Sequence, residues 1–346
     1  RLRDVDSGEE FETSARVIVN AAGPFVDELN QEWGLTTEHR IVYSKGIHLV
    51  VPRITTTRHD RVLAFFDDTQ RLFYVIPMGN RSVIGTTDTR VDDPHTHVTD
   101  ADREFLLDQI NKRLDLRVPL TAGDVLAERS GARPLVVPAA GAVPDADWTS
   151  LSRRHAIEHD AQRGVVTIFG GKLTDCLNVG REVGDAVADL GVTLHRDRRD
   201  WYGEPSSATR AEFMLRAERM GLDDLRQRPG VEPLSARLWR RYGIRAFGLL
   251  EAIRADPSMG RDVLESTDYL RVELHEAAQV EMIVKLEDFM MRRSKIDLVA
   301  PDAHVRDPDG LREVATILFG ADADARVAEY LATKQHTIGQ AASAEP

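Results

Sequence analysis

The chain has 346 residues, of which 42% are hydrophobic and 29% charged, and its formal net charge is −12 at pH 7. This length is enough to bury more than one hydrophobic core, so we expect two or three domains. The acidic balance argues against nucleic acid as a partner, and no apolar run approaches the ~20 residues that span a membrane. The single cysteine, Cys176, excludes an intrachain disulfide and suits a reducing compartment such as the cytoplasm.

The chain begins with two strand patterns that run into glycine turns. Residues 2–5 and 11–13 alternate as the strands of a hairpin around Gly8. Residues 15–19 then form a buried-strand pattern that ends in the small residues of 21–24. Small side chains at the carboxyl end of a strand let a planar ligand approach the backbone, and open αβ sheets bind ligands at this end. Tight strand–helix packing without a ligand is the alternative interpretation.

Between Lys45 and Ile168 the pattern is mostly of short strands separated by Pro, Gly, Asp and Asn turns. Adjacent strands with few crossovers favour an antiparallel sheet. One helix interrupts them, since Thr99 suits an N-cap and Asp102 and Glu104 favour a first turn. The expected strands are 47–51, 62–66, 72–76, 82–86, 135–137 and 165–169.

A third glycine turn follows the last of these strands. Gly170-Gly171-Lys172 separates the strand from a helical pattern over residues 173–190. Such a turn points free backbone N–H groups and the positive end of a helix dipole at an anionic or electron-rich ligand, and Lys172 adds a full charge. Many αβ proteins have such glycines without a ligand, so this segment alone leaves both interpretations open. We expect Cys176, on this helix, to be a small core residue.

The last third of the chain is predicted to be helical. Residues 191–206 are charged and rich in turn formers, which is typical of a linker. Gly320 is a plausible helix stop, and the Ala-rich end of the chain is expected to be disordered. The expected helices are 207–220, 234–242, 245–254, about 270–292, 309–319 and 323–335.

Several motifs occur in an order that resembles one family, the FAD-dependent glycerol-3-phosphate dehydrogenases. The likeness runs from about residue 12 to about residue 335, which is nearly the whole chain. Each motif is modest evidence, and their order makes the resemblance strong. The motifs are Asn20 to Asp27, Ser44 to Pro52, Tyr74 to Pro77, Ile84 to Thr89, Gly131 to Leu135, Leu151 to His155, Phe169 to Thr174 and Leu286 to Ser294.

The resemblance implies a mixed α+β and α/β fold with three parts and a tail. The family's Gly-x-Gly-x-x-Gly turn, which holds the FAD pyrophosphate, does not occur in the chain. We therefore expect the C-terminal part of a longer flavoenzyme, which binds FAD weakly or not at all by itself. The expected parts are the remnant of a Rossmann-like FAD-binding domain (1–40 and 165–192), a mostly antiparallel substrate domain (41–164), a helical domain (205–336) and a disordered tail (337–346).

The resemblance also assigns residues to a site. Arg133 and Arg153 correspond to substrate-binding arginines, and a guanidinium suits phosphate because it binds two oxygens and stays charged. His48 falls in the substrate pocket beside the flavin, and Lys172 would neutralise charge on the flavin or on the substrate oxygen. Whether His48, Arg133 or Lys172 takes the substrate proton stays open. The expected FAD contacts are Ala22, Gly23, Gly170, Gly171, Lys172, Leu173 and Thr174.

Other interpretations of these residues exist without the family. The arginines could be solvated strand ends, and a lone strand histidine such as His48 is more often structural. Residues 86–88 read as a simple strand terminus. His95 and His97 make a poor metal site because no Cys or carboxylate trio accompanies them, so no metal is expected.

The resemblance implies oxidation of sn-glycerol 3-phosphate to dihydroxyacetone phosphate, with hydride transfer to FAD and electrons passed to a quinone. A glycerol-3-phosphate oxidase that uses oxygen is one alternative, and a non-catalytic binding module is the other. We expect the chemistry to lie outside the helical region. This region is expected to cover the catalytic lobes, to contact another subunit, as in a homodimer, or to contact the cytoplasmic face of a membrane, in the last case through apolar rather than charged groups.

Overall fold

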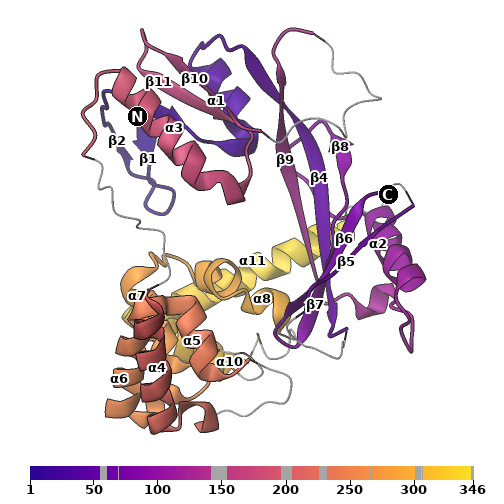
Figure 1. Ribbon diagram of the computed structural model, residues 1–346, viewed down its shortest axis with the longest axis vertical. Helices are drawn as coiled ribbons and strands as arrows, with labels where there is room; N and C mark the ends of the chain where they lie inside the picture. The colour runs from indigo at the N-terminus through magenta and orange to yellow at the C-terminus, as the bar shows by residue number, and fades with distance from the viewer. Residues whose placement is uncertain are drawn as a thin grey trace. The chain divides into compact units, whose positions relative to one another are not determined.

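The computed structural model describes most of the chain as two compact units (Figure 1). Unit 1 comprises Arg1–His48, Gly85–Leu106 and Arg129–Arg199, and unit 2 comprises Leu49–Ile84, Leu107–Glu128 and Asp200–Pro346. The described residues are 1–54, 61–68, 70–141, 154–195, 205–225, 232–264, 267, 269–300, 305 and 307–343, with side chains through 333. Within these residues, no helix combines the length and the apolar character needed to cross a bilayer.

Unit 1 contains a three-stranded sheet in the order β10-β11-β3. β11 (Val165–Phe169) runs antiparallel to β10 (Ala156–Asp160) and parallel to β3 (Ile18–Asn20), with Thr167 opposite Asn20. The predicted N-terminal hairpin is confirmed as β1 (Leu2–Arg3) and β2 (Glu10–Phe11), which pair antiparallel. Helices follow the two parallel strands: α1 (Val26–Glu32) after β3, and α3 (Cys176–Asp189) after β11.

The second sheet has the strand order β5-β6-β7-β4-β8, and β9 also pairs with β4. The pairs β5–β6 and β4–β8 are antiparallel, as the spacing of the strands predicts. The strands are β4 (His39–Pro52), β5 (Leu63–Phe66), β6 (Leu72–Met78), β7 (Arg81–Gly85), β8 (Thr89–Val91) and β9 (Ala127–Pro138). The predicted interrupting helix is α2 (Asp100–Arg113), and the Thr99 hydroxyl accepts a hydrogen bond from the backbone N–H of Asp102 at 3.2 Å.

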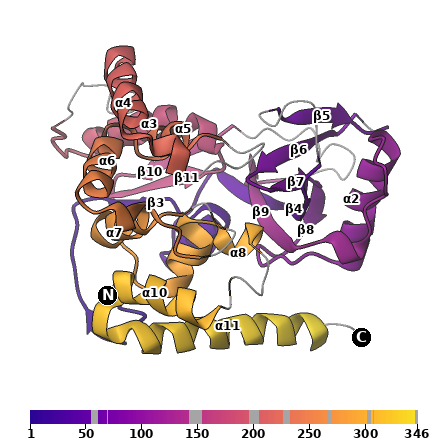
Figure 2. The ribbon, with the colours of Figure 1, turned by 90° about the horizontal axis from the view of Figure 1, so that it is seen from below.

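Unit 2 holds the helices of the C-terminal third (Figure 2). Local signals set several of their ends. Asp307 caps α10 by accepting from the N–H of Gly310 at 2.9 Å, and Gly320 (φ +59°) ends this helix as the sequence predicts. The helices are α4 (Ser207–Met220), α5 (Leu234–Tyr242), α6 (Ala246–Ala255), α7 (Arg271–Val280), α8 (Ile296–Val299), α10 (Pro308–Phe319) and α11 (Ala323–Ser343).

The prediction of one helix over about 270–292 is wrong. α7 ends at Val280, and a separate π-helical turn covers Asp288–Arg293. Met282 has a φ of +49°, which no helical residue adopts, and the Asp288 carboxylate accepts the N–H groups of Val284 and Lys285 at 3.1 and 2.9 Å. An acidic side chain that satisfies these free N–H groups starts a new turn, so the segment breaks where the apolar periodicity continues.

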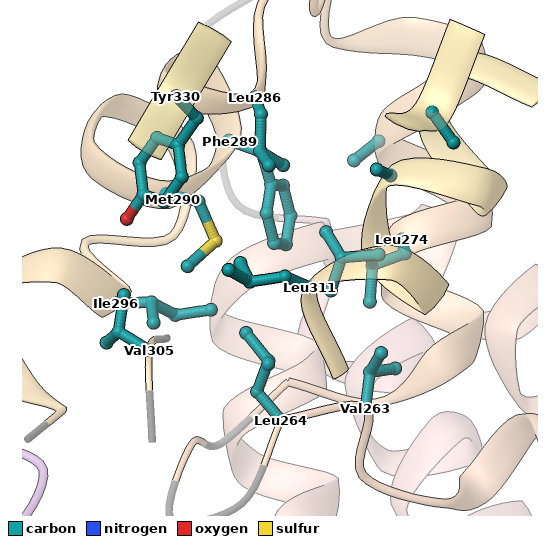
Figure 3. Packing of buried hydrophobic residues seen from close by; sticks show 14 residues of the cluster. Val263, Leu264, Leu274, Leu286, Phe289, Met290, Ile296, Val305, Leu311 and Tyr330 are labelled. Carbon is teal, nitrogen blue, oxygen red and sulfur yellow. The ribbon is translucent and has the colours of Figure 1, made fainter. Parts of the chain in front are cut away.

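Two large apolar clusters pack the described helices of unit 2. In the first, Phe289 and Met290 of the π-helical turn are buried with Leu274 of α7 and Leu311 of α10 (Figure 3). In the second, helices α4, α5 and α6 meet at the rings of Phe213, Trp239 and Phe247, with centroids 5.4 to 6.4 Å apart. These buried side chains pack the helices against one another within this unit.

One further expectation differs from the structure. Cys176 is exposed rather than a small core residue, because it opens α3, a helix that buries only Ala186. The expected domain limits and the disorder of the tail stay predictions.

Candidate functional site

The two glycine turns that the sequence singled out lie at the same edge of the three-stranded sheet. β3 and β11 run parallel and side by side, so the turns that follow Asn20 and Phe169 both leave the carboxyl ends of their strands. This edge is where open αβ sheets bind ligands. The sequence-predicted FAD contacts on the two turns therefore come from neighbouring strands.

Backbone conformation explains the glycines in these turns. Gly23 has a φ of +57°, and a Cβ added to it would find no atom within 4 Å, so the backbone is open there. Gly170 (φ +63°) is enclosed instead: its added Cβ would overlap Val136 Cγ2 and lie 3.5 Å from the carbonyl oxygens of Pro134 and Arg154. The second turn is therefore fixed against β9, one residue from Arg133.

A buried amide group holds the first turn in place. The Asn20 carbonyl Oδ1 accepts from the N–H of Ala22 at 3.2 Å, and its Nδ2 donates to Val26 O and to Asn30 Oδ1. Thr167 Oγ1 of β11 donates to the same Asn30 oxygen at 3.1 Å. These bonds tie β3, its turn, α1 and β11 together inside unit 1, which is the preorganisation that a ligand edge needs.

Arg133 on β9 lies directly over Gly46 on β4. A Cβ added to Gly46 would lie 2.5 Å from Arg133 Nη1 and closer still to Nη2, so only glycine leaves room for the guanidinium. Arg133 Nη2 donates to Thr86 Oγ1 at 2.7 Å, and Nη1 donates to Thr87 O at 3.1 Å. Two N–H groups of the guanidinium are thus bonded to Thr86 and Thr87, which lie 47 and 46 residues before Arg133 in the sequence.

The segment after β7 also orients β4. Thr87 Oγ1 accepts from the backbone N–H of Ile47 at 3.1 Å, and Ser44 Oγ donates to Asp88 Oδ1. Asp88 Oδ1 lies 3.6 Å from Arg133 Nη1 and adds an ion pair. Residues 86–88, which the sequence suggested were a simple strand terminus, therefore position Arg133 and the strand beneath it.

His48 lies two residues beyond Gly46, on the same face of β4. Gly85 closes against it, because a Cβ there would lie 2.6 Å from His48 Cδ2 and 2.8 Å from Ile47 O. Burial, followed by the positive charges of Arg129 and Arg133, lowers the pKa of His48 below its ordinary value of 6.5. The imidazole is consequently neutral at pH 7 and able to accept a proton.

A buried ion pair fixes the other face of β4. Lys45 Nζ lies 2.5 Å from Asp102 Oδ2 of α2, and both side chains are only 10% exposed. Burial would raise the pKa of Asp102, but hydrogen bonds from Lys45 and Thr99 outweigh it and hold that pKa below its usual range. This pair anchors the strand directly before Gly46.

The remaining predicted residues are placed less centrally. Lys172 is exposed at the turn before α3, and among the described residues no hydrogen bond or ion pair joins it to His48 or Arg133. Leu173, expected at the flavin, is 90% exposed. Arg153 lies outside the described residues. The roles of these residues stay predictions.

Sequence reasoning missed Arg129. It shares a strand face with Arg133, since residues 129, 131 and 133 alternate along β9. The sequence does contain a signal for it: Arg129 and Arg133 each lie two residues from Gly131, and alternate residues of a strand share a face.

Comparisons with known proteins identify the family of the chain. Residues 1–197 match the family model described as FAD dependent oxidoreductase, and residues 216–326 match the C-terminal domain of alpha-glycerophosphate oxidase. A glycerol-3-phosphate dehydrogenase 2 of Mycobacterium tuberculosis is 32% identical over 96% of this chain and 55% of its own length. A mitochondrial glycerol-3-phosphate dehydrogenase of Arabidopsis thaliana is 30% identical over 92% of this chain and 51% of its own length.

A solved structure has a similar fold. The glycerol-3-phosphate dehydrogenase from Bacillus halodurans, complexed with FAD, gives a TM-score of 0.70 at 24% identity over 96% of this chain and 64% of that one. The chain spans 55% and 51% of the two relatives above, so it corresponds to about half of each. Since the first family model covers more than half of the residues, the chain belongs to the FAD-dependent oxidoreductases.

Proposed function

We propose that the protein carrying this chain oxidises sn-glycerol 3-phosphate to dihydroxyacetone phosphate with FAD and passes the electrons to a quinone. The observation that carries the proposal is the cluster of Arg133, Gly46 and His48. Pro134, the residue after Arg133, packs against the turn at Gly170. Two named relatives that are glycerol-3-phosphate dehydrogenases support the choice of substrate.

The residues at the strand ends fit the flavin. The open, left-handed backbone at Gly23 and the positive φ of Gly170 and Gly171 suit a planar ring lying on main chain. Ala22, Gly23 and residues 170–174 would hold the ring. When bound, FAD supplies the hydride acceptor. The chain lacks the family's pyrophosphate turn, so we expect it to bind FAD weakly by itself and to be inactive alone.

The chain's own residues have separate tasks in this proposal. Arg133, and with it Arg153, binds the phosphate, because a guanidinium keeps its charge and offers several donors. His48 takes the hydroxyl proton, since its lowered pKa leaves it neutral whereas Arg133 stays protonated. Lys172 supplies positive charge toward the substrate oxygen or the flavin.

Electron transfer and location complete the proposal. A quinone acceptor lies in a membrane, so we propose that the protein works at the cytoplasmic face of one. The exposed Met282 (86%), Val284 and Met291 of unit 2 suit apolar contact with that surface. The alternative is a homodimer that contacts through the same side chains. Co-sedimentation with lipid vesicles would support the membrane contact, and a dimer in sedimentation velocity would support the homodimer. An oxidase using oxygen is the other candidate, and stoichiometric hydrogen peroxide would identify it.

Anaerobic bleaching of bound flavin tests the oxidation itself. Glycerol 3-phosphate should bleach the flavin absorbance of the full-length, FAD-loaded protein that carries this chain, whereas glycerol at the same concentration should not. His48→Asn should slow bleaching by roughly 100-fold or more, as expected for a removed general base. Absence of bleaching by glycerol 3-phosphate in the unmodified protein would contradict the proposed substrate.

A further inference from the structure

Arg129 differs from Arg133 in how many of its guanidinium N–H donors are engaged. Arg133 already donates from Nη1 and Nη2 to Thr87 O and Thr86 Oγ1. Arg129 is exposed, and within the described part of the chain no hydrogen bond or ion pair engages it. An arginine has five N–H donors in a planar fork, so Arg129 keeps its full capacity for an anion.

The pairing of β9 with β4 places Arg129 beside His48. Leu126 N donates to Val50 O and Ala139 N donates to Glu38 O, so residue numbers rise along β9 as they fall along β4. Counted from either bond, Arg129 comes opposite residue 47 or 48. Both strands lie together in Figures 1 and 2.

The strand face between the two arginines is open. Ser130 bonds Thr96 on the opposite face, which leaves residues 129, 131 and 133 on the face of the guanidinium groups. Gly131 is exposed, and a Cβ there would meet no atom within 4 Å. With a rise of roughly 3.3–3.4 Å per residue, the Cα atoms of Arg129 and Arg133 are about 13 Å apart along the strand with Gly131 midway, so a small phosphomonoester fits over Gly131 between the two long side chains.

We infer that Arg129 is a substrate-contacting residue that binds the phosphate of a small phosphomonoester over Gly131. This inference rests on the proposed function. Arg133, locked by residues 86–88, supplies a fixed charge, whereas Arg129 supplies the free donors. Its charge also favours the neutral form of the nearby His48. Arg129 therefore gives the site its preference for a phosphorylated over an uncharged polyol.

The test measures binding of glycerol 3-phosphate to the full-length, FAD-loaded protein by titration calorimetry, together with its steady-state KM and kcat. Arg129→Gln should raise Kd and KM roughly 5- to 20-fold, a charge-assisted contact reduced by solvent screening, with kcat changed less than about 2-fold. Inhibition by inorganic phosphate should weaken in parallel. Arg129→Lys, which keeps a charge, should recover part of the affinity.

Arg219→Gln is the matched control, since it removes an exposed guanidinium on α4 of unit 2 and should change neither constant. Unchanged Kd and phosphate inhibition in Arg129→Gln would overturn the inference and leave the proposed function standing. No binding of glycerol 3-phosphate by the unmodified protein would contradict the proposed function, and the inference with it.

Discussion

Replacing Gly46 with alanine should disable the arginine site while leaving the backbone intact. The added methyl group would lie 2.5 Å from Arg133 Nη1 and closer to Nη2, and it meets the movable end of a side chain rather than main chain. The guanidinium must therefore leave its place over Gly46. It then loses its bonds to Thr86 Oγ1 and Thr87 O and its alignment with the substrate.

The magnitude follows from the contact that is lost. A hydrogen bond to a charged group contributes about 1.5–3 kcal/mol, so misplacing Arg133 should raise KM for glycerol 3-phosphate roughly 10- to 150-fold. The Arg133 side chain is 25% exposed, which gives the displaced group water to bind and keeps the loss of folding stability to about 1–2 kcal/mol. Steady-state kinetics and urea unfolding measure the two quantities on one preparation.

Two further variants decide whether Gly46 acts through Arg133. Gly180→Ala on α3 is the control, because its Cβ would meet no atom within 4 Å, and it should leave KM unchanged. In the Arg133→Gln background, Gly46→Ala should add almost nothing, since the group it displaces is gone. Full additivity of the two substitutions, or a Gly46→Ala protein with unmodified KM, would refute the reasoning.

Three other expectations concern pH and the buried pair. The pKa of folded His48 lies below the ordinary 6.5, so the acid limb of the kcat/KM profile should lie below pH 6.5. Arg129→Gln removes a charge that lowers this pKa, so the limb should move to higher pH in that variant. A limb that does not move would argue against His48 as the base. In the unfolded chain His48 takes up a proton near pH 6.5, whereas in the folded protein it does so only at lower pH. The free energy of unfolding should therefore fall as pH drops from 6.5 toward the lowered pKa. In urea titrations His48→Asn should reduce this pH dependence of the free energy of unfolding. Lys45→Met leaves the Asp102 carboxylate buried without its cation and should lower the free energy of unfolding in urea by about 3 kcal/mol. Lys112→Met, which removes the lysine of an exposed pair, should lower it by about 0.5 kcal/mol. Equal losses would contradict a stabilising role for the buried pair.

The sequence predicted elements where local chemistry decides them. The cap at Asp307 and the stop at Gly320 lie within the few residues that make them, so both ends of α10 follow from the sequence. The break after Val280 was missed, because the positive φ of Met282 interrupts a segment whose apolar residues continue at helical spacing.

The site divides in the same way. Motif order pointed to His48 and Arg133, but the bonds from Arg133 to residues 86 and 87 join segments 46 and 47 residues apart, and only folding brings them together. Arg129 is different, since alternation along one strand already places it on the face of Arg133. Exposure of Cys176 could not be foreseen, because it depends on how little of α3 is buried.

The long strands have a consequence for any attempt to divide this protein. The chain passes between the two compact units at His48, Gly85 and Arg129, and each of these residues also belongs to the site. A domain exchange or a split-protein design that cuts at the unit limits would sever the backbone at the imidazole or at its neighbours. Flexible linkers are where modules are usually recombined, and here three of the passages run through, or at the end of, β-strands instead. Hybrid enzymes made from relatives should therefore keep β4, β7 and β9 from a single parent.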